Sequence, residues 1–396
     1  MILADKFTCT ACMACVDACS QQVLRADIDI NGYFAIHVNT MSSCVECGKC
    51  TRVCPVLMNK KIDRESAPYA AWNIDSEQRQ LSASGGVFAA IAALVISKCG
   101  SVYGAAIEGF EVKHKRIITE SDLHLLQGSK YQHSDMTGIY KQVRNDLQQG
   151  MYVLFSGLGC QVAGLLSFLD KTNKDKLYTI DTICGGLSTL LPILHLKESG
   201  KYKRIISFRD KVNGWKSSGF RYSLKLLRND GSTEDLGLDN LVLNTFSSKL
   251  MKRSSCLDCK FTGFSRVSDC TIGDFWGDVH FREQHTRGLS VFITHDSRIM
   301  NLIHEAKMEI HRVTWKEIIA SNHNIYWTHY PYIRYFISRK AALHAIQRKD
   351  YAKALQQMDS WSVAGLFLRL YLKVNMLHRK FSFFYTISIK DKKQIT

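Results

Sequence analysis

The chain has 396 residues, 46% of them hydrophobic, and 52 basic against 36 acidic residues give a formal charge of +16. This length predicts two or three domains, and the longest apolar run, near residues 87–96, is shorter than the roughly eighteen residues that a membrane span requires. A basic chain can bind nucleic acid, an anionic membrane face or acidic ligands. Because no nucleic-acid-binding motif accompanies the charge, we expect no nucleic-acid partner.

The first 58 residues predict a bacterial-type ferredoxin module with two 4Fe-4S clusters. They hold two runs of the form C-x2-C-x2-C-x3-C, in which the fourth cysteine of each run binds the cluster of the other. The expected ligands are therefore Cys9, Cys12, Cys15 and Cys54 for one cluster, and Cys44, Cys47, Cys50 and Cys19 for the other.

Other uses of these cysteines fit the sequence less well. Disulfides are typical of secreted chains, whereas the start MILADKFTCTAC has no signal-peptide pattern. Zinc sites favour paired C-x2-C knuckles with a longer gap. Reduced thiols and the lack of a membrane span indicate a cytoplasmic protein. Ser20 stands where a proline usually follows the fourth cysteine, whereas the second run keeps Pro55, and this difference bears on local rigidity.

The segments after the first cysteine run follow two patterns. Residues 27–39 alternate around Asn31-Gly32, which predicts a tight hairpin beside the clusters. Residues 59–68 are polar and end in proline, which predicts a linker.

An α/β domain is expected over residues 69–330. A small polar residue precedes a helix at 87–100, and residues 140–150 have helical periodicity and end in glycine. Residues 151–183 indicate strand, helix and strand, a βαβ unit with parallel strands. A further hairpin is expected around Asp230-Gly231.

Residues 331–396 predict a helical, basic and aromatic C-terminal tail, which contains 13 basic residues and three aspartates. One interpretation is that its helices pack on the domain with solvated basic faces. The other is a peripheral contact with anionic lipid on the inner membrane face, or with an acidic redox partner.

Six cysteines remain outside the ferredoxin runs. Cys160 and Cys184 each follow an expected parallel strand, so both should lie at the edge where α/β sheets bind ligands. With the C-x2-C pair Cys256 and Cys259 they could hold a third 4Fe-4S cluster. Zinc, or simple burial of Cys160 and Cys184, are the alternatives. Cys270 is a rival ligand, and Cys99 is expected to be structural.

Glycine-rich turns indicate a phosphate-bearing redox cofactor. SASGG opens a helix, and SGLG leads from a strand into a helix, so backbone N–H groups should face an anion. The dinucleotide fingerprint G-x-G-x-x-G is absent from the sequence. FAD is the natural choice because it exchanges hydride on one side and single electrons on the other.

A resemblance to a known family is carried by motifs in the order YAAWN, SASGGVF, GSKYQHSD, FSGLGCQVAGL, DTICGG, SFRDKVNGWK, SCLDCKF and RVSDCTIGDFWG. Over roughly residues 1–280 the chain resembles the beta subunits of coenzyme factor-420 hydrogenases and dehydrogenases. The resemblance implies an FAD-binding α/β domain that oxidises or reduces a deazaflavin, with electrons passing through iron–sulfur clusters. The family loop often has GTPCQ where this chain has GLGCQ, and Cys270 stands where an aliphatic residue is common.

The resemblance also implies which residues serve the cofactors. The matched cysteines for a domain cluster are Cys160, Cys184, Cys256 and Cys259. The matched flavin-pocket residues are Ser84, Gly85, Gly86, Lys130, Tyr131, Ser134, Ser156, Gly157, Gln161, Asp274 and Trp276.

Several other side chains are candidates by their chemistry. Lys130 is the catalytic candidate, since a cation near the flavin ring stabilises its anionic reduced form; the alternative is a surface lysine that pairs with phosphate. Arg209, Lys211 and Lys216 either hold an acidic substrate or lie in a solvated loop. His280, His285 and His295 share no ligand spacing and are expected to be ordinary.

Together these patterns predict a cytoplasmic oxidoreductase with FAD, two N-terminal 4Fe-4S clusters and a third in the domain. It would exchange electrons with a redox partner protein or ferredoxin-like carrier and with a small soluble substrate. The alternatives are a non-catalytic electron-transfer subunit of a larger complex, and a reductase accessory to surface-polysaccharide assembly near the membrane. The physiological substrate, the direction of electron flow and the oligomeric state stay open.

Overall fold

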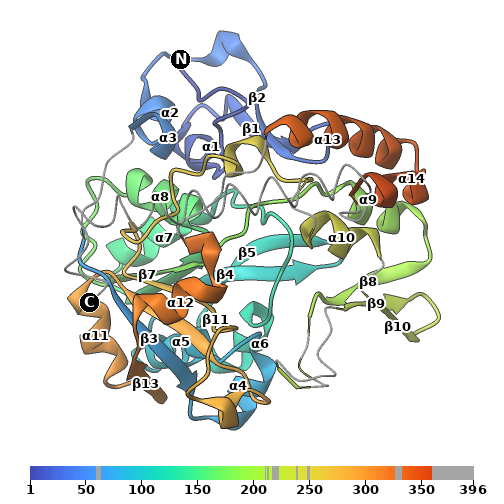
Figure 1. Cartoon of the computed structure of the whole chain (residues 1–396). Coiled ribbons are helices and arrows are strands. Elements are labelled where there is room, and N and C mark those ends of the chain that lie inside the picture. The colour runs from blue at the N-terminus through green and yellow to red at the C-terminus, as the bar shows by residue number, and fades with distance from the viewer. Residues whose placement is uncertain are drawn as a thin grey trace.

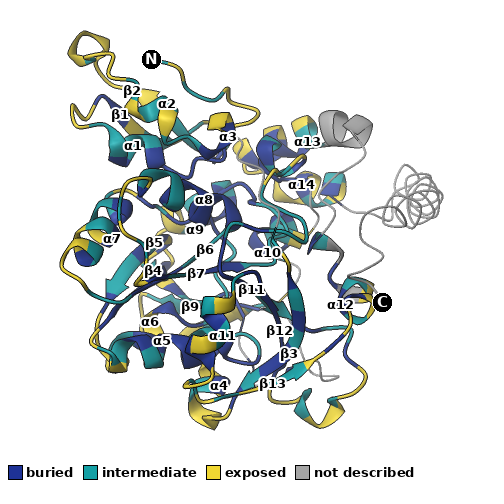
Figure 2. Cartoon of the chain, turned by 90° about the vertical axis from the view of Figure 1, so that its left-hand side faces the viewer, coloured by how far each residue is buried: buried dark blue, intermediate teal, exposed yellow. Residues whose placement is uncertain are grey.

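The computed structural model describes residues 1–58, 64–209, 211, 214–215, 223–237, 240–247, 250–325 and 332–358. The N-terminal cysteine-rich module stands at one end of the molecule, and α4 (Ser76–Leu81) lies at the opposite end (Figure 1). Figure 2 shows the same arrangement after a quarter turn, with the module above the mostly buried central sheet.

The module is built around the expected hairpin. Strands β1 (Leu24–Ile28) and β2 (Phe34–Val38) pair antiparallel, and the short helices are α1 (Ala14–Ala18), α2 (Lys49–Arg52) and α3 (Pro55–Met58). The turn needs glycine at Gly32, which has φ +78° and approaches Thr189 so closely that a Cβ would clash with it. The hairpin tip is therefore fixed against the rest of the chain.

The main sheet has eight strands in the order β13-β3-β12-β11-β7-β6-β4-β5. Strands β4, β6, β7 and β11 run parallel, and antiparallel strands flank them on both sides. The bounds are β3 Ala67–Asn73, β4 Ser101–Glu108, β5 Glu111–Ile117, β6 Val153–Gly157, β7 Leu177–Thr182, β11 Cys270–Asp274, β12 Ser290–Thr294 and β13 Met308–Arg312.

Each face of this sheet carries its own core, because successive residues of a strand point to opposite faces. Leu154 of β6 packs with α5 (Val87–Ser97) and α11 (Ser297–Ile303). Its neighbour Phe155 packs with α7 (Ile139–Gln148) and α8 (Gly159–Phe168). The second core also contains Cys12, Met13 and Ala14, so the first cysteine loop is part of the interior.

A smaller antiparallel sheet has the order β10-β9-β8, with β8 Tyr202–Ser207, β9 Leu224–Arg228 and β10 Thr233–Leu236. The hairpin expected around Asp230-Gly231 joins β9 to β10. The remaining helices are α6 (Leu123–Leu126), α9 (Leu191–Glu198), α10 (Leu241–Ser247), α12 (Trp315–Ser321), α13 (Tyr332–Gln347) and α14 (Tyr351–Met358). None of the helices within the described ranges is long and apolar enough to cross a membrane.

The expected linker at 59–68 is wrong at its end, because Ala67 and Pro68 begin β3 and the Ser66 hydroxyl bonds to His295 inside the protein.

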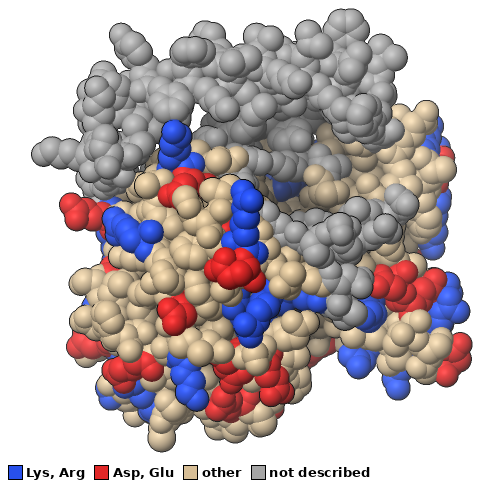
Figure 3. Space-filling view, turned by 60° about the horizontal axis from the view of Figure 1, so that its bottom comes forward, with Lys and Arg blue, Asp and Glu red and all other residues tan. Residues whose placement is uncertain are grey.

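In the C-terminal tail, α13 and α14 bury Ala342, Ile346 and Ala354 in a shared core, so this part packs on the protein. Residues 359–396 lie outside the described ranges, and a membrane contact there stays a prediction. On the face shown in Figure 3, basic and acidic side chains are interspersed.

Candidate metal centre

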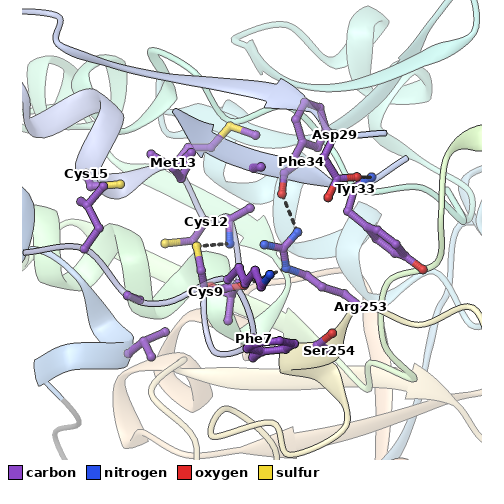
Figure 4. A pocket seen from close by; sticks show the side chains of 18 of the residues that line it. Phe7, Cys9, Cys12, Met13, Cys15, Asp29, Tyr33, Phe34, Arg253 and Ser254 are labelled. Atoms are coloured by element: carbon purple, nitrogen blue, oxygen red, sulfur yellow. Dashed lines mark hydrogen bonds between the residues drawn. The ribbon is translucent and has the colours of Figure 1, made fainter. Parts of the chain in front are cut away.

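A cavity of about 300 Å³ opens between the N-terminal module and the α/β domain. Its lining includes the thiols of Cys9, Cys12, Cys15 and Cys54, of which Cys9, Cys12 and Cys15 are labelled in Figure 4. Burial raises the pKa of Cys12 to about 12, and repulsion from Cys9 and Cys54 acts in the same direction. The structure thus brings Cys54 to the first three cysteines, the grouping that the spacing predicts.

Both cysteine runs use the same backbone shape. Ala11 and Met13 have φ of 51° and 66°, and Glu46 and Gly48, at the matching positions of the second run, have φ of 50° and 68°. A left-handed residue on each side of the second cysteine curls the loop around a centre. The Ala11 N–H donates to Cys9 Sγ at 3.4 Å, a contact that also stabilises a thiolate.

The second run lies nearer the surface. Cys47 is exposed, whereas Cys44 and Cys50 are half-buried. The fourth expected ligand, Cys19, accepts an N–H bond from Val23 at 3.4 Å. Cys50 raises the pKa of Cys15, although burial is the larger cause, so the two runs are neighbours.

A second, smaller cavity lies in the α/β domain and is also lined by four thiols, those of Cys160, Cys184, Cys256 and Cys259. Cys160 is the second residue of α8, which follows β6, and Cys184 follows β7. These strands are parallel, so both cysteines lie at the same edge of the sheet. Burial raises the pKa of Cys160 well above its ordinary value, and the other three thiols add to this.

Backbone N–H groups point at the sulfur atoms of this cavity. Gly186 donates to Cys184 at 3.3 Å, Leu187 to Cys256 at 3.4 Å and Phe261 to Cys259 at 3.4 Å. Hydrogen bonds to cysteine sulfur are among the features that tune an iron–sulfur cluster. The donor set therefore fits such a cluster.

The rival cysteines lie elsewhere. Cys270 begins β11 and pairs with Ile180 inside the sheet, and it is fully buried in the core beside Leu154. It is therefore absent from the lining of the four-thiol cavity. Cys99 is exposed after α5, with φ of 56°, and it lines neither of the two cavities.

The thiols surround space instead of converging on a point. Among the residues described, no group of three or more histidine, cysteine or acidic side chains is placed to hold a single metal ion. Zinc would need four sulfur atoms about 2.3 Å from one ion. A 4Fe-4S cluster binds its cysteines through separate irons, which suits thiols spread around a cavity.

The two four-cysteine cavities adjoin each other. Thr10 lines both of them, and Arg253 and Ser254 line the first where Ser255 and Cys256 line the second. The Tyr140 hydroxyl donates to the carbonyl oxygens of Cys12 and Gln161, at 2.8 and 3.0 Å. The loops that carry the two sets of thiols are thereby fixed to each other.

Three of the expected flavin residues, Ser134, Ser156 and Gln161, belong to one largely buried hydrogen-bond network at the end of β6. The Gln161 amide donates to the Ser134 hydroxyl at 2.9 Å. His114, which no sequence motif singles out, lies 2.9 Å from Ser134 Oγ and 2.9 Å from the Ser156 carbonyl oxygen. Burial lowers the pKa of His114 to about 4, so the ring is neutral. A Cβ on Gly157 would lie 3.1 Å from Gln161 Oε1, so glycine leaves room for this side chain.

The Ser84-Gly85-Gly86 turn is packed between β3 and β12. Ser84 Oγ donates to the Leu289 carbonyl at 2.6 Å, and a Cβ on Gly85 would lie 2.5 Å from the Ala71 carbonyl oxygen. The Gly85 N–H donates to the Ser290 hydroxyl. This contact corrects the expectation that this N–H faces a ligand. Gly86, with φ +83°, still begins α5.

Two cations hold this turn from the other side. Arg209 donates to both oxygens of Asp274, at 2.7 and 2.9 Å, and to the Ala83 carbonyl. Lys211 Nζ donates to the carbonyls of Arg79, Ser84 and Arg287. Both side chains are buried, so the solvated-loop interpretation is wrong for them, while Lys216 lies outside the described residues.

Lys130 and Tyr131 connect the network around Ser134 with the cations that hold the Ser84 turn. The Tyr131 ring stacks on Phe246 at 4.1 Å, and its hydroxyl accepts from Arg209 at 3.4 Å. Lys130 Nζ donates to the Gln127 carbonyl at 2.6 Å, and burial lowers its pKa to about 7. Trp276 stacks on Trp215 at 4.6 Å. The expected flavin residues thus follow one edge of the sheet.

The three histidines expected to be ordinary have local partners. His295 bonds to Ser66 and Thr271, His285 Nε2 lies 2.7 Å from Asp278, and His280 pairs with Glu317.

A cavity lined by four thiols in ferredoxin spacing defines an iron–sulfur protein of the electron-transfer class. Residues 8–58 match the 4Fe-4S dicluster domain, and residues 150–318 match the family described as the C terminus of the Coenzyme F420 hydrogenase/dehydrogenase beta subunit. The chain therefore joins a dicluster domain to a domain of the coenzyme factor-420 hydrogenase and dehydrogenase beta-subunit family.

Similarity to individual proteins is weaker. No curated protein matches the chain. The solved structures that are similar include the F420-reducing [NiFe] hydrogenase complex from Methanosarcina barkeri, in a xenon derivative. One of its chains has 14% identity and a TM-score of 0.43, over 64% of this chain and 84% of its own length.

Proposed function

We propose that this protein is an FAD-dependent iron–sulfur oxidoreductase in which electrons pass between the N-terminal module and FAD through a third cluster. The observation that carries the proposal is the contact between the two four-cysteine cavities, which share Thr10 in their walls. A chain of redox centres needs neighbouring sites, and the cysteines provide them.

Bound 4Fe-4S clusters supply single-electron transfer, and FAD converts single electrons into hydride chemistry. The residues of the chain supply position and insulation. Tyr140 fixes the two thiol-bearing loops at a constant separation. Met13, Val162 and Leu165 exclude water beside the first cavity.

FAD is proposed at the edge of the sheet where β6, β7 and β11 end. The buried network of Ser134, Gln161 and His114 fixes the polar groups beneath this edge. Lys130 supplies a cation for an anionic reduced flavin ring. The substrate proposed for this site is a small soluble hydride acceptor or donor of the deazaflavin type, and a redox protein is proposed as the partner of the N-terminal module.

An iron count on two cysteine variants tests the third cluster. Anaerobically reconstituted protein should hold about twelve iron atoms, or about eight if only the N-terminal pair forms. Cys256→Ser should lose about four, because it removes one of the four thiols in the smaller cavity. Cys270→Ser is the matched control, since this buried thiol lies outside that cavity, and it should keep the full count. Equal iron in both variants and the parent protein would rule the third cluster out.

A non-catalytic electron-transfer subunit is the second candidate function. It is favoured by the way the polar side chains at the proposed flavin edge bond to one another. Flavin content together with turnover of a soluble deazaflavin separates the two candidates. The third alternative, an accessory reductase of surface-polysaccharide assembly, depends on the basic tail, most of which lies outside the described residues.

A further inference from the structure

Arg253 is a buried cation aimed at the first four-cysteine cavity. It is only 6% exposed and lines the cavity together with Cys9, Cys12, Cys15 and Cys54. It comes from the α/β domain, more than two hundred residues away in the chain. Figure 4 shows its guanidinium group between the cysteine loop and the β1–β2 hairpin.

Within the described residues, the hydrogen-bond acceptors of Arg253 are neutral. Nε donates to the Cys9 carbonyl at 2.7 Å and Nη1 to the Phe34 carbonyl at 2.5 Å. In the part of the chain that is described, no carboxylate forms an ion pair with it. The acidic residue in the described cavity wall, Asp29, accepts N–H bonds from Asn31 and Tyr33.

A buried charge without a counter-charge is costly. The anion that could balance Arg253 is a set of thiolates, and four cysteines of a cluster motif surround the same cavity. Lys6 and Arg339 also line this cavity, so its wall carries three cations against one carboxylate. The net positive charge of the wall therefore favours a negatively charged ligand.

We infer that Arg253 is the electrostatic partner of the first 4Fe-4S cluster and raises its reduction potential. A positive charge favours the reduced cluster, which is the more negative of the two states, and net charge is one determinant of cluster potential. The effect should be strong because burial limits screening by salt. The inference rests on the dicluster part of the proposed function and on neither FAD nor the third cluster.

The consequence is a preferred direction of electron transfer between the two clusters of the N-terminal module. An electron that enters at the more exposed second run would be more stable at the first cluster, beside the α/β domain. Arg253 thus favours transfer of electrons to the first cluster. Its positive charge comes from the α/β domain, which is also the domain that receives the electrons.

A redox titration of anaerobically reconstituted full-length variants, followed by electron paramagnetic resonance, tests this. Arg253→Gln keeps a hydrogen-bond donor and loses the charge, and Arg253→Lys keeps the charge. We expect Arg253→Gln to make reduction of the first cluster at least about tenfold less favourable, which is about 59 mV for one electron. Arg253→Lys should change this equilibrium by less than about threefold. The Cys54→Ser variant identifies the signal of the first cluster.

Lys6→Met is the matched control, because Lys6 lines the same cavity but is exposed. Its effect should be smaller and should vanish in high salt, whereas that of Arg253→Gln should persist. Loss of the first cluster in Arg253→Gln with retention in Arg253→Lys would also support the inference, because the charge is then what holds the cluster. Equal shifts in Arg253→Gln and Arg253→Lys, no shift in Arg253→Gln, or loss of the cluster in both variants would overturn it. If the parent protein shows no 4Fe-4S signal, the proposed function fails instead.

Discussion

At the scale of single residues, the cysteines of the candidate sites can be recognised from the sequence, whereas Arg253 and His114 cannot. The cysteines of the first cavity follow from spacing, because a cubane fixes the distance between its ligands. Arg253 has no such signal, since its role depends on a fold that brings it to Cys9 and Phe34. His114 has none for the same reason. Its partners Ser134 and Ser156 lie in other segments of the chain.

Lys130 gives a prediction for pH dependence. Because burial lowers its pKa to about 7, the side chain is cationic below that pH and neutral above it. If it faces the reduced flavin, the flavin potential should fall more steeply with pH above about 7 than below it. Lys130→Met should remove this change of slope, and Lys130→Arg should stay cationic throughout. A flavin titration over this pH range checks it, and identical curves for all three proteins would exclude Lys130 from the flavin site.

At the scale of elements, α8 connects the two cavities. It carries Cys160 in its first turn, and Gly164, one turn later, faces the first cysteine loop. A Cβ at Gly164 would lie 3.0 Å from both Cys12 Sγ and the Tyr140 hydroxyl. A Cβ here would push these neighbours away by a few tenths of an ångström, so glycine suits this close approach.

The close approach of α8 can be tested by adding volume. Gly164→Val should destabilise the protein by about 1–3 kcal/mol through overpacking, and should reduce the iron content of the first cluster. Gly237→Val is the control, because a Cβ there would meet nothing within 4 Å. Urea unfolding and iron analysis measure both effects. If Gly164→Val matched the control in both, α8 would not position the first loop.

The same scale shows what local patterns can predict. The β6–α8–β7 unit and both hairpins follow from periodicity and turn residues, which act over short stretches of chain. Such patterns do not identify β3, β12 and β13 as neighbours at one side of the sheet. Their pairing joins residues about 70 and about 290, and no local pattern records such a contact. The end of the expected linker was wrong for this reason.

At the scale of the whole molecule, the cavities form a path from the surface to the sheet. The second run has an exposed thiol at Cys47, the first cavity lies between module and domain, and the smaller cavity lies at the sheet edge. The first cysteine loop contributes Cys12 and Met13 to the core beneath α7 and α8. Module and domain therefore share a core, which holds the two cavities beside each other.

The most direct test of the account is electron transfer across this path in a single turnover. Anaerobic, FAD-loaded protein is mixed with a reduced ferredoxin-type donor, and the absorbance of the bound flavin is followed. We expect rapid flavin reduction in the parent protein and in Cys270→Ser, and a loss of at least about a hundredfold in rate in Cys256→Ser, a barrier increase of about 2.7 kcal/mol. Flavin reduction at the parent rate in Cys256→Ser, or a protein that binds no FAD, would contradict the account.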